Sequence, residues 1–563
     1  MSPLFSRVTA PLACALCVGL VACRAQTTSP GTATAPAATE TTSSAPAEVD
    51  LGLGNHHHPI TTVSAKAQEL FNQGMTLAFG FNHEEAIRLF QAAATEDPMA
   101  PMPHWGIAWA LGPNYNLDID DPRAVQASEA MAKAKALAER AVPIERDYID
   151  VMAGRYSPDP TADRSALARR YANGMRALSQ KYPDDLDAAT LYAESLMNLR
   201  PWKLWSLDGK PAEDTLLILS VLEQVLVRDP NHVGANHFYV HAIEASPTPE
   251  RALASAERLK TLTPGAGHLV HMPAHVLART GDHAGAALAN AAGAAADRVY
   301  ARRAPGDSFY VMAYFSHNLH FLADSHMMQG RSADAAKAAA ELAERLTPHA
   351  SMMPMGESMV VMPLSVKLRF EQFADILDDP EPPEDRPVMR AWWRFARGVA
   401  LARTKQVPQA SAERSELVAA IDAVPDSALF GGTGLESAKA VLGLALVVLD
   451  ARIAEARGDA RTAIARWNEA VAIGDRLPYD EPPVWFYPLR ESLGGALLRA
   501  NRAAEAERVF REDLVRHRRN PRALFGLREA LTRQKKTDDA LWVTQAFEQG
   551  WRNADATLSV DGL

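Results

Sequence analysis

Histidines recur at a fixed spacing in the middle of the chain, and this period constrains the fold more than any other feature. His237 and His271 are 34 residues apart, and His241 and His275 are again 34 residues apart. Sequence features that return at a period of 20 to 50 residues indicate a repeat protein, in which each repeat packs against its neighbours. The period therefore predicts a stack of equivalent units.

The same period appears in residues that have no metal-binding chemistry. Gly74, Ala86, Phe90 and Pro98 stand at the separations of the 34-residue tetratricopeptide pattern, which has two helices per repeat. Two other segments repeat parts of the pattern: residues 490–510, with Leu493, Gly494, Ala506 and Phe510, and residues 249–264, with Ala252, Ala256 and Pro264. We therefore predict an all-α fold, a tetratricopeptide-repeat superhelical solenoid.

A solenoid also accounts for the length of the chain. At 563 residues, with 47% hydrophobic residues and no change of composition between its halves, the chain is too long for one compact core. Helical pairs can be followed from about Ala65 to Asn553, and a proline-rich stretch at residues 378–388 interrupts them. We expect an N-terminal array over 61–380 that carries the histidines and a C-terminal array over 381–555.

The first residues have the pattern of an export signal. Arg7 precedes an apolar run at residues 10–20 that is too short to span a bilayer. Leu20-Val21-Ala22-Cys23 resembles the bacterial lipobox, which implies a signal peptide over 1–22, a lipid on Cys23, and an outer-membrane location facing the periplasm or the surface. All three cysteines lie in this segment, so the mature domain is expected to have no thiolate metal ligand.

Residues 23–60 are rich in Thr, Ala, Ser and Pro, which predicts a flexible tether. The run His56-His57-His58 at its end is expected to be solvated or to bind metal adventitiously. The formal net charge of −10 and the lack of a basic stripe argue against nucleic acid as a partner. The expected partners are the membrane, through the lipid, and a protein or peptide.

Several motifs are similar to those of one group of bacterial proteins. They are WGIAWALGPNYN from Trp105, HAIEAS from His241, GHLVHMPAHV from Gly267 and DEPPVWFYPLRESLG from Asp480. Through these motifs the chain resembles a family of bacterial tetratricopeptide-repeat lipoproteins over most of residues 60 to 550. The resemblance implies an all-helical repeat fold and assigns no reaction.

The repeat register predicts that histidines from three helices share one face. Aligning Ala252, Ala286 and Ala335 places His237, His271 and His320 at one equivalent position of three helices. Three residues before this position lie His268 and His317, and four residues after it lie His241, His275 and Asp324. Residues three and four apart lie on the same face of a helix. We therefore predict a transition-metal site on the concave face, with seven ligands: His237, His241, His268, His271, His275, His317 and His320. By the same register Glu194, Glu244 and Asp324 are further ligands or hydrogen-bond partners of the ligands.

The sequence favours copper as the metal and leaves zinc and iron open. Imidazole binds all three, and an exported, histidine-dominated centre suits copper best. If the carboxylates join the ligands, a dinuclear iron or zinc centre becomes the better prediction. The chain has no Walker, GxSxG or HExxH motif, which leaves a metal-dependent oxidoreductase as the enzymatic hypothesis.

Two alternatives remain open at this stage. One is a scaffold without catalytic activity that binds proteins or peptides in the cell envelope, although such grooves usually present Lys, Arg and Asn rather than His, which is mostly neutral at pH 7. The other is a packed structural network of histidines.

Overall fold

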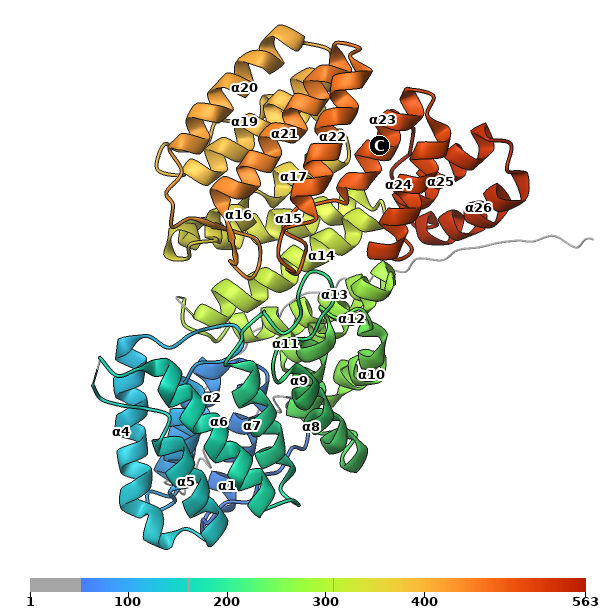
Figure 1. The fold of residues 1–563 in the computed structure, drawn as a ribbon. Coiled ribbons are helices and arrows are strands. Elements are labelled where there is room, and N and C mark those ends of the chain that lie inside the picture. Colours follow the sequence, from blue (N-terminus) through green and yellow to red (C-terminus); the bar gives the residue numbers. More distant parts are fainter. Residues whose placement is uncertain (1–51, 160, 307) are drawn as a thin grey trace, which may run out of the picture. The chain divides into compact units, whose positions relative to one another are not determined.

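The computed structural model describes residues 52–159, 161–306 and 308–563 (Figure 1). The expected signal peptide, the lipidated Cys23 and most of the expected tether lie outside these residues. Within them the regular secondary structure is almost entirely helical, and successive helices pack as antiparallel pairs. The predicted all-α tetratricopeptide solenoid is confirmed.

The first half of the array contains thirteen α-helices among the described residues. They are α1 (Ala65–Phe79), α2 (His83–Glu96), α3 (Met102–Leu111), α4 (Asp121–Leu137), α5 (Pro143–Ala153), α6 (Arg164–Lys181), α7 (Leu186–Met197), α8 (Thr215–Arg228), α9 (Val233–Ile243), α10 (Leu253–Leu262), α11 (Gly267–His271), α12 (Pro273–Thr280) and α13 (His283–Ala301).

The second half contains the remaining described helices and one short hairpin. They are α14 (Ser316–Met328), α15 (Ser332–Leu346), α16 (Gly356–Val360), α17 (Met362–Arg369), α18 (Phe373–Asp378), α19 (Pro387–Arg403), α20 (Val407–Asp422), β1 (Leu429–Phe430), β2 (Glu436–Ser437), α21 (Ala438–Ala456), α22 (Ala460–Gly474), α23 (Leu489–Arg499), α24 (Ala503–Arg516), α25 (Pro521–Arg533) and α26 (Thr537–Trp551). Short 3₁₀ helices occur in both halves, η1 (Ala138–Arg140) and η2 (Pro249–Ala252) in the first and η4 (Thr347–Met352) in the second, and the π-helical η3 (Val311–Phe315) precedes α14. The two strands pair antiparallel, with Leu429 opposite Ser437.

Glycine and aromatic residues fix how neighbouring repeats pack. A Cβ on Gly74 of α1 or on Gly106 of α3 would lie under 3.0 Å from the Phe90 ring, so this ring fits only between two helices that lack a side chain there. The same arrangement returns near the other end of the array, where Phe510 lies against Gly494 and Gly526. Close contact of this kind is what the tetratricopeptide pattern predicts for these positions.

Two large hydrophobic cores fill most of the array, and they meet at α13 and η3. One runs from Leu53 to Tyr314 and the other from Ala287 to Leu563. The boundary expected near residue 380 falls inside the second core, where residues 379–386 form only a loop between α18 and α19. The histidines therefore lie close to where the two cores meet.

Residues 52–60 pack against the array, which corrects the expectation that the tether extends to residue 60. Leu53, His58 and Ile60 are buried, and the backbone N–H of Gly265 donates to the Gly52 carbonyl at 2.8 Å. The His58 ring lies 2.7 Å from the Asp187 carboxylate, so this histidine is not a solvated one. Burial of apolar side chains together with an ion pair orders this segment.

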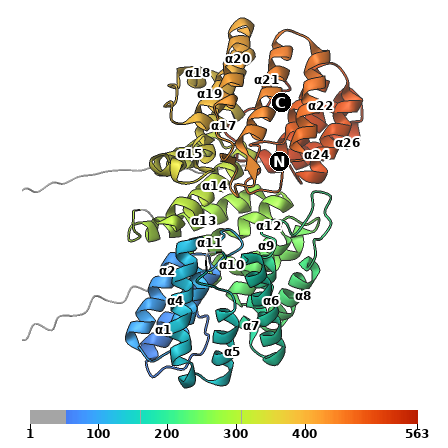
Figure 2. The same ribbon diagram turned by 60° about the vertical axis from the view of Figure 1, so that its left-hand side comes forward.

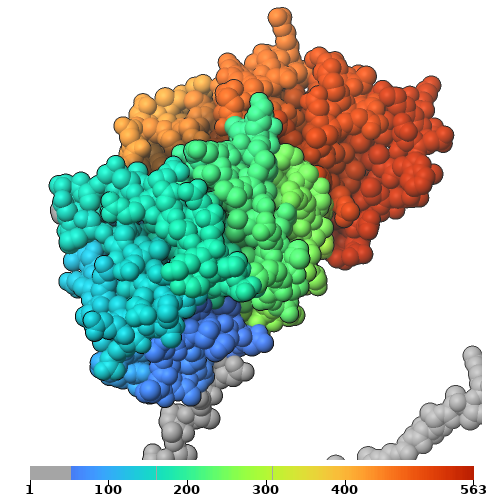
Figure 3. Space-filling view, turned by 60° about the horizontal axis from the view of Figure 1, so that its bottom comes forward, coloured from blue at the N-terminus to red at the C-terminus, as the bar shows by residue number. Residues whose placement is uncertain are grey.

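The pairs follow one another in chain order in both ribbon views, and the histidine-bearing helices lie next to each other in the middle of the array (Figures 1 and 2). In the space-filling view the green part of the array borders the red part (Figure 3). Glu250 of the green part and Arg518 of the red part form an ion pair, with 3.0 Å between Glu250 Oε2 and Arg518 Nη1. No helix among the described residues has both the length and the apolar character that crossing a membrane requires.

Candidate metal centre

Four helices carry the predicted histidines into one buried cluster. His237 and His241 lie on α9, one turn apart, and face α11 and α12. Pro273 has no backbone N–H, so the helix breaks at Met272 and becomes α11 and α12. Six imidazoles meet here, and we call them the histidine cluster: His237, His241, His268, His271, His275 and His317. The first five are at most 3% exposed, and His317 is half-buried.

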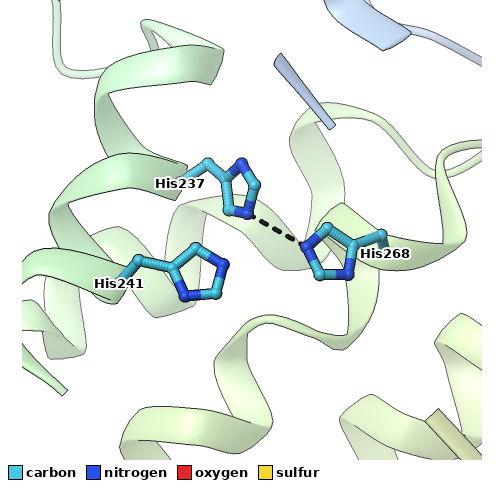
Figure 4. Close-up of side chains that lie close together, drawn as sticks. All are labelled: His237, His241 and His268. Atoms are coloured by element: carbon cyan, nitrogen blue, oxygen red, sulfur yellow. Dashed lines mark hydrogen bonds between the residues drawn. The ribbon is translucent and has the colours of Figure 1, made fainter. Parts of the chain in front are cut away.

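The first group in the cluster is His237, His241 and His268, which we call the 237 triad (Figure 4). Each offers a ring nitrogen within 4.8 Å of the other two. The Nε2 atoms of His237 and His268 are 3.1 Å apart, and His241 Nε2 is buried without a hydrogen-bond partner in the described part of the chain. The Phe81 ring covers the triad, with its centroid 4.6 Å from that of His237.

The second group is His271, His275 and His317, which we call the 271 triad. The Nε2 atoms of His271 and His275 are 3.1 Å apart. The His317 ring reaches them from α14, with its centroid 5.0 Å from that of His271.

Carboxylates connect the two triads. Glu244 accepts from Nδ1 of His241 at 3.0 Å with one oxygen and from Nδ1 of His275 at 2.7 Å with the other. Glu481, from the loop between α22 and α23, also contacts His275 Nδ1. We call Glu244 and Glu481 the glutamate pair.

The hydrogen bonds of the rings decide where their lone pairs point. His271 Nδ1 is 3.0 Å from Asn290 Oδ1, and Asn290 Nδ2 donates to Ser325, so the amide oxygen accepts and His271 Nδ1 carries the hydrogen. When His275 likewise donates its Nδ1–H to an ionised member of the glutamate pair, neither facing Nε2 carries a hydrogen. Two lone pairs then face each other at 3.1 Å, an arrangement that a cation between them stabilises.

These spacings suit a metal ion. Imidazole nitrogens bind zinc at about 2.0–2.1 Å, and two ligands on one ion are then about 3.0–3.4 Å apart. The facing Nε2 pairs of both triads fall in this range at 3.1 Å. His237 is also oriented, because its Nδ1 lies 2.5 Å from the Phe79 carbonyl oxygen, which can only accept a hydrogen bond.

Burial keeps the imidazoles neutral, which is the form that binds metals. It lowers the pKa of His241 to about 3 and, against the effect of the Asn290 hydrogen bond, that of His271 to about 4. The pKa values of His268 and His275 are also lowered, first by burial and then by neighbouring histidines.

Burial raises the pKa of both members of the glutamate pair, and for Glu481 the nearby Glu244 charge adds to this effect. Two carboxylates this close cannot both ionise easily without a cation. A bound metal would supply the charge that they lack.

Three predicted residues lie outside these groups. His320 and Asp324 lie further along α14 and border a separate cavity. The register aligns His320 with His271, but the cluster meets α14 near its N-terminal end, so His317, one turn earlier, is the residue that reaches it. Glu194 accepts from Asn198 at 3.0 Å and belongs to none of the candidate metal groups.

Sequence reasoning did not identify Glu481 or Phe81. Glu481 lies in the irregular Tyr479–Pro488 loop, where no periodicity indicates which side chain points inward. Phe81 occupies the turn between α1 and α2 with a left-handed φ of 58°. Its role depends on packing against α9 and α11, which a local pattern does not predict.

No family model matches the chain, and no curated protein matches it. Among solved structures, the human IFIT1 dimer with m7Gppp-AAAA aligns at a TM-score of 0.33 and 12% identity, over 87% of this chain and 91% of that one. The yeast Tom70 crystal structure aligns at a TM-score of 0.33 and 11% identity, over 85% and 98%. The function of the site must therefore be argued from its own residues.

Proposed function

We propose that this protein binds transition-metal ions in the histidine cluster. The observation that carries the proposal is the contact between His271 Nε2 and His275 Nε2 at 3.1 Å, in a place where the Nδ1 atom of each ring already has an oxygen partner. A purely structural network would place a donor against an acceptor at such a contact. A metal ion is the partner that accepts both lone pairs.

Copper is the metal we propose for the all-imidazole triads, with zinc and iron as alternatives. Imidazole is a good ligand for copper, while the glutamate pair adds the oxygen ligands that favour zinc or iron. His241 and His275 each belong to a triad and also contact Glu244, so the cluster has room for more than one ion. For iron or zinc, we propose that the glutamate pair would supply oxygen ligands in addition to the imidazoles.

The proposed activity is that of a metal-dependent oxidoreductase in an exported, lipid-anchored protein. A redox-active metal would supply one-electron chemistry when bound. The protein's own contribution is a dry pocket of neutral imidazoles, covered by Phe81 and oriented by Phe79, Asn290 and Glu244. The lipobox-like Cys23 supports the anchoring proposal.

Elemental analysis tests the metal proposal. The purified protein is supplied with copper, zinc and iron in separate experiments, dialysed, and assayed for metal per chain. At least one equivalent of one metal is expected in the parent and less than half as much in a His271→Ala, His275→Ala double variant. The matched control is His517→Ala, because His517 pairs with Asp513 far along the chain and should leave the metal content unchanged. Less than one equivalent of every metal in the parent would contradict the proposal.

A second candidate function, peptide binding, has its own observation. Four arginines donate to the backbone carbonyls of four consecutive residues, 560 to 563. They come from the first helix of four successive helical pairs, namely α19, α21, α23 and α25. The pairs are Arg499 with Val560 (2.6 Å), Arg403 with Asp561 (2.6 Å), Arg522 with Gly562, and Arg452 with Leu563 (3.3 Å). Contacts to backbone carbonyls do not depend on the peptide sequence. This groove is thus suited to hold an extended peptide.

A labelled peptide with the sequence of residues 558–563 tests this second function. A chain that stops at residue 557 should bind the peptide, and Arg403→Gln in the same chain should weaken binding about tenfold. Arg490→Gln is the control, because Arg490 pairs with Asp475 and is not one of the four. Equal binding to all three proteins would show that the arginine groove does not recognise the peptide.

A further inference from the structure

A cavity borders the arginine groove in the second half of the array. Residues of α17, α18, α19, α21, α23 and α25 line it, together with the loop before α23 and Gly562. The space open to the centres of water molecules is about 50 Å³, which is room for about three or four waters. No histidine is among the described residues that border this cavity, so it is separate from the histidine cluster.

Arginines dominate the polar part of the cavity wall. The charged residues that border it, among those that the structure describes, are Arg369, Arg403, Arg452, Arg522, Glu371 and Glu491. Arg369 and Arg522 are buried, with 5% and 7% of their surface exposed. Burying a cation costs free energy unless an anion pairs with it. The balance of charges around the cavity therefore decides what it can hold.

The hydrogen-bonding capacity of Glu491 is already used. Its two oxygens accept from Arg369 at 2.5 and 3.1 Å, and Oε2 also accepts from Arg522 Nε at 3.0 Å. Oε1 accepts a further hydrogen bond from Asn520 Nδ2 at 2.9 Å. One carboxylate thus serves two guanidinium groups and an amide.

Two other glutamates pair with three more arginines. Glu455 pairs with Arg452 and with Arg499, and Glu371 pairs with Arg403. Together with the two pairs described above, five arginines share three glutamates. Two positive charges are therefore left uncompensated in these ion pairs.

Residues 560–563 do not remove this excess of positive charge. Their backbone carbonyls accept hydrogen bonds from the arginines but carry no net charge, and the Asp561 side chain is exposed. Even an ionised carboxyl group on Leu563, next to Arg452, would compensate only one of the two charges. The cavity wall thus keeps a positive charge that a bound anion would compensate.

One buried N–H group at the cavity has no acceptor. Arg369 Nε is buried without a hydrogen-bond partner in the described part of the chain. The Tyr487 ring lies against the same guanidinium, with 5.4 Å between Arg369 Cζ and the ring centroid. Leaving a buried donor unpaired costs about 1–3 kcal/mol, and more when the group is charged. An anion in the cavity would supply the missing acceptor.

The pKa values of the arginines also reflect the crowding of positive charge. Burial lowers the pKa of Arg522 to about 10, and repulsion from Arg369 adds to this effect. Burial likewise lowers the pKa of Arg403, followed by repulsion from Arg452. Arginine nevertheless stays charged at pH 7. A bound anion would oppose both repulsions.

We propose that this cavity binds a small oxyanion of the phosphate type. A phosphate group carries a charge of about −1.5 to −2 at pH 7 and offers three strong acceptor oxygens. Guanidinium groups bind phosphate through pairs of N–H donors. Inorganic phosphate and a small phosphomonoester share this chemistry. The inference rests neither on the proposed metal function nor on peptide binding.

Calorimetric titration of the full chain in a phosphate-free buffer tests the inference. Inorganic phosphate should bind with one ion per chain, and acetate, which carries a single charge, should bind at least tenfold more weakly. Glycerol phosphate distinguishes the two sources. Tighter binding of glycerol phosphate than of inorganic phosphate would assign the cavity to a phosphomonoester, and weaker binding would assign it to the free ion.

The ion pair between Arg403 and Glu371 provides two matched variants. Arg403→Gln removes a positive charge and should weaken phosphate binding about fivefold, whereas Glu371→Gln removes a negative charge and should tighten it about fivefold. Both substitutions break the same ion pair, so a loss of local structure would change the affinity in the same direction in both. The control is Arg298→Gln, because Arg298 pairs with Glu341 and does not border the cavity.

Thermal unfolding of each protein without phosphate shows whether the variants fold like the parent. A folded parent that binds no phosphate would overturn the inference. Acetate binding as tight as phosphate binding would overturn it as well, and so would affinity shifts of the same sign in Arg403→Gln and Glu371→Gln.

Discussion

At the residue scale, four of the six histidines of the cluster are oriented by the group that their Nδ1 atom contacts. Phe79 orients His237, Asn290 orients His271, and Glu244 orients both His241 and His275. A metal ligand held by a second hydrogen bond has a fixed tautomer and ring direction. These partners come from α1, α13 and the end of α9, so the cluster forms only when several repeats have packed.

The structure distinguishes two histidines that the repeat register treats as equivalent. We expect His271→Ala to reduce bound metal by at least half, because His271 belongs to the 271 triad. His320→Ala should leave the metal content within about 10% of the parent value, since His320 borders the separate cavity. Metal per chain is measured after loading and dialysis. Equal losses in the two variants would mean that the register, and not the observed geometry, describes the site.

The lowered pKa of His271 predicts a pH dependence of stability in the metal-free protein. The pKa of His271 is about 4 in the folded state and about 6.5 in the unfolded state. The contribution of the neutral ring to the free energy of unfolding is therefore present above pH 6.5 and is lost as the pH falls towards 4. When the pH is lowered from 6.5 to 5, the parent should therefore lose about 2 kcal/mol of unfolding free energy relative to His271→Gln. Urea unfolding at the two pH values measures it. A difference that stays constant would show that His271 is not desolvated.

At the scale of single elements, the turn within each repeat repeatedly uses a left-handed residue. Gly281, Gly330 and Gly458 fill this position with φ values of 74° to 83°, and Asn501 fills it with 58°. Phe81 takes the same conformation at a cost that glycine avoids. Its ring contacts three histidines of the cluster, which explains an aromatic residue at this turn.

Two glycines with open space around them separate backbone strain from packing. Neither Gly458 nor Gly443 has an atom within 4 Å of an added Cβ. Gly458 has a φ of 74°, so Gly458→Ala should lower the free energy of unfolding by about 1 kcal/mol. Gly443 lies inside α21, where Gly443→Ala should raise it by about 0.5–1 kcal/mol. Chemical unfolding of both variants measures the two effects, and a shift of the same sign in both would contradict this account.

The sequence predicted the helices well because their packing repeats. Gly74 and Phe90 identify a repeat from spacing alone, and Phe510 identifies another. The register was less successful where a repeat departs from the average, as in α14, which meets the cluster one turn earlier than the alignment indicates. Glu481 has no repeat position at all, so only the three-dimensional structure reveals its contact with His275.

At the scale of the whole molecule, the proposed centre joins the two hydrophobic cores. Most of its ligands come from α9, α11 and α12, whereas His317 comes from α14 and Glu481 from a loop that packs in the second core. A metal that binds only the folded state stabilises it by about 2.7 kcal/mol at a concentration of 100 times the dissociation constant. Because ligands come from both cores, this stabilisation should act on the unfolding of both.

Glu481→Gln tests this coupling, since glutamine keeps the size of the side chain but removes its charge. In the metal-free protein the variant should be as stable as the parent or slightly more stable, because burial raises the pKa of Glu481 and its charge is unfavourable there. With metal added, the parent should gain several degrees in unfolding temperature and the variant less than half of that gain. Scanning calorimetry with and without a chelator measures both values. Glu436→Gln is the control, because Glu436 lies in the β2 strand, where its carboxylate accepts from the backbone N–H of Ser437 and not from a histidine of the cluster. If the parent and Glu481→Gln gained equally from metal, the loop between α22 and α23 would not contribute to the centre, and the metal would be held by the first core and α14 alone.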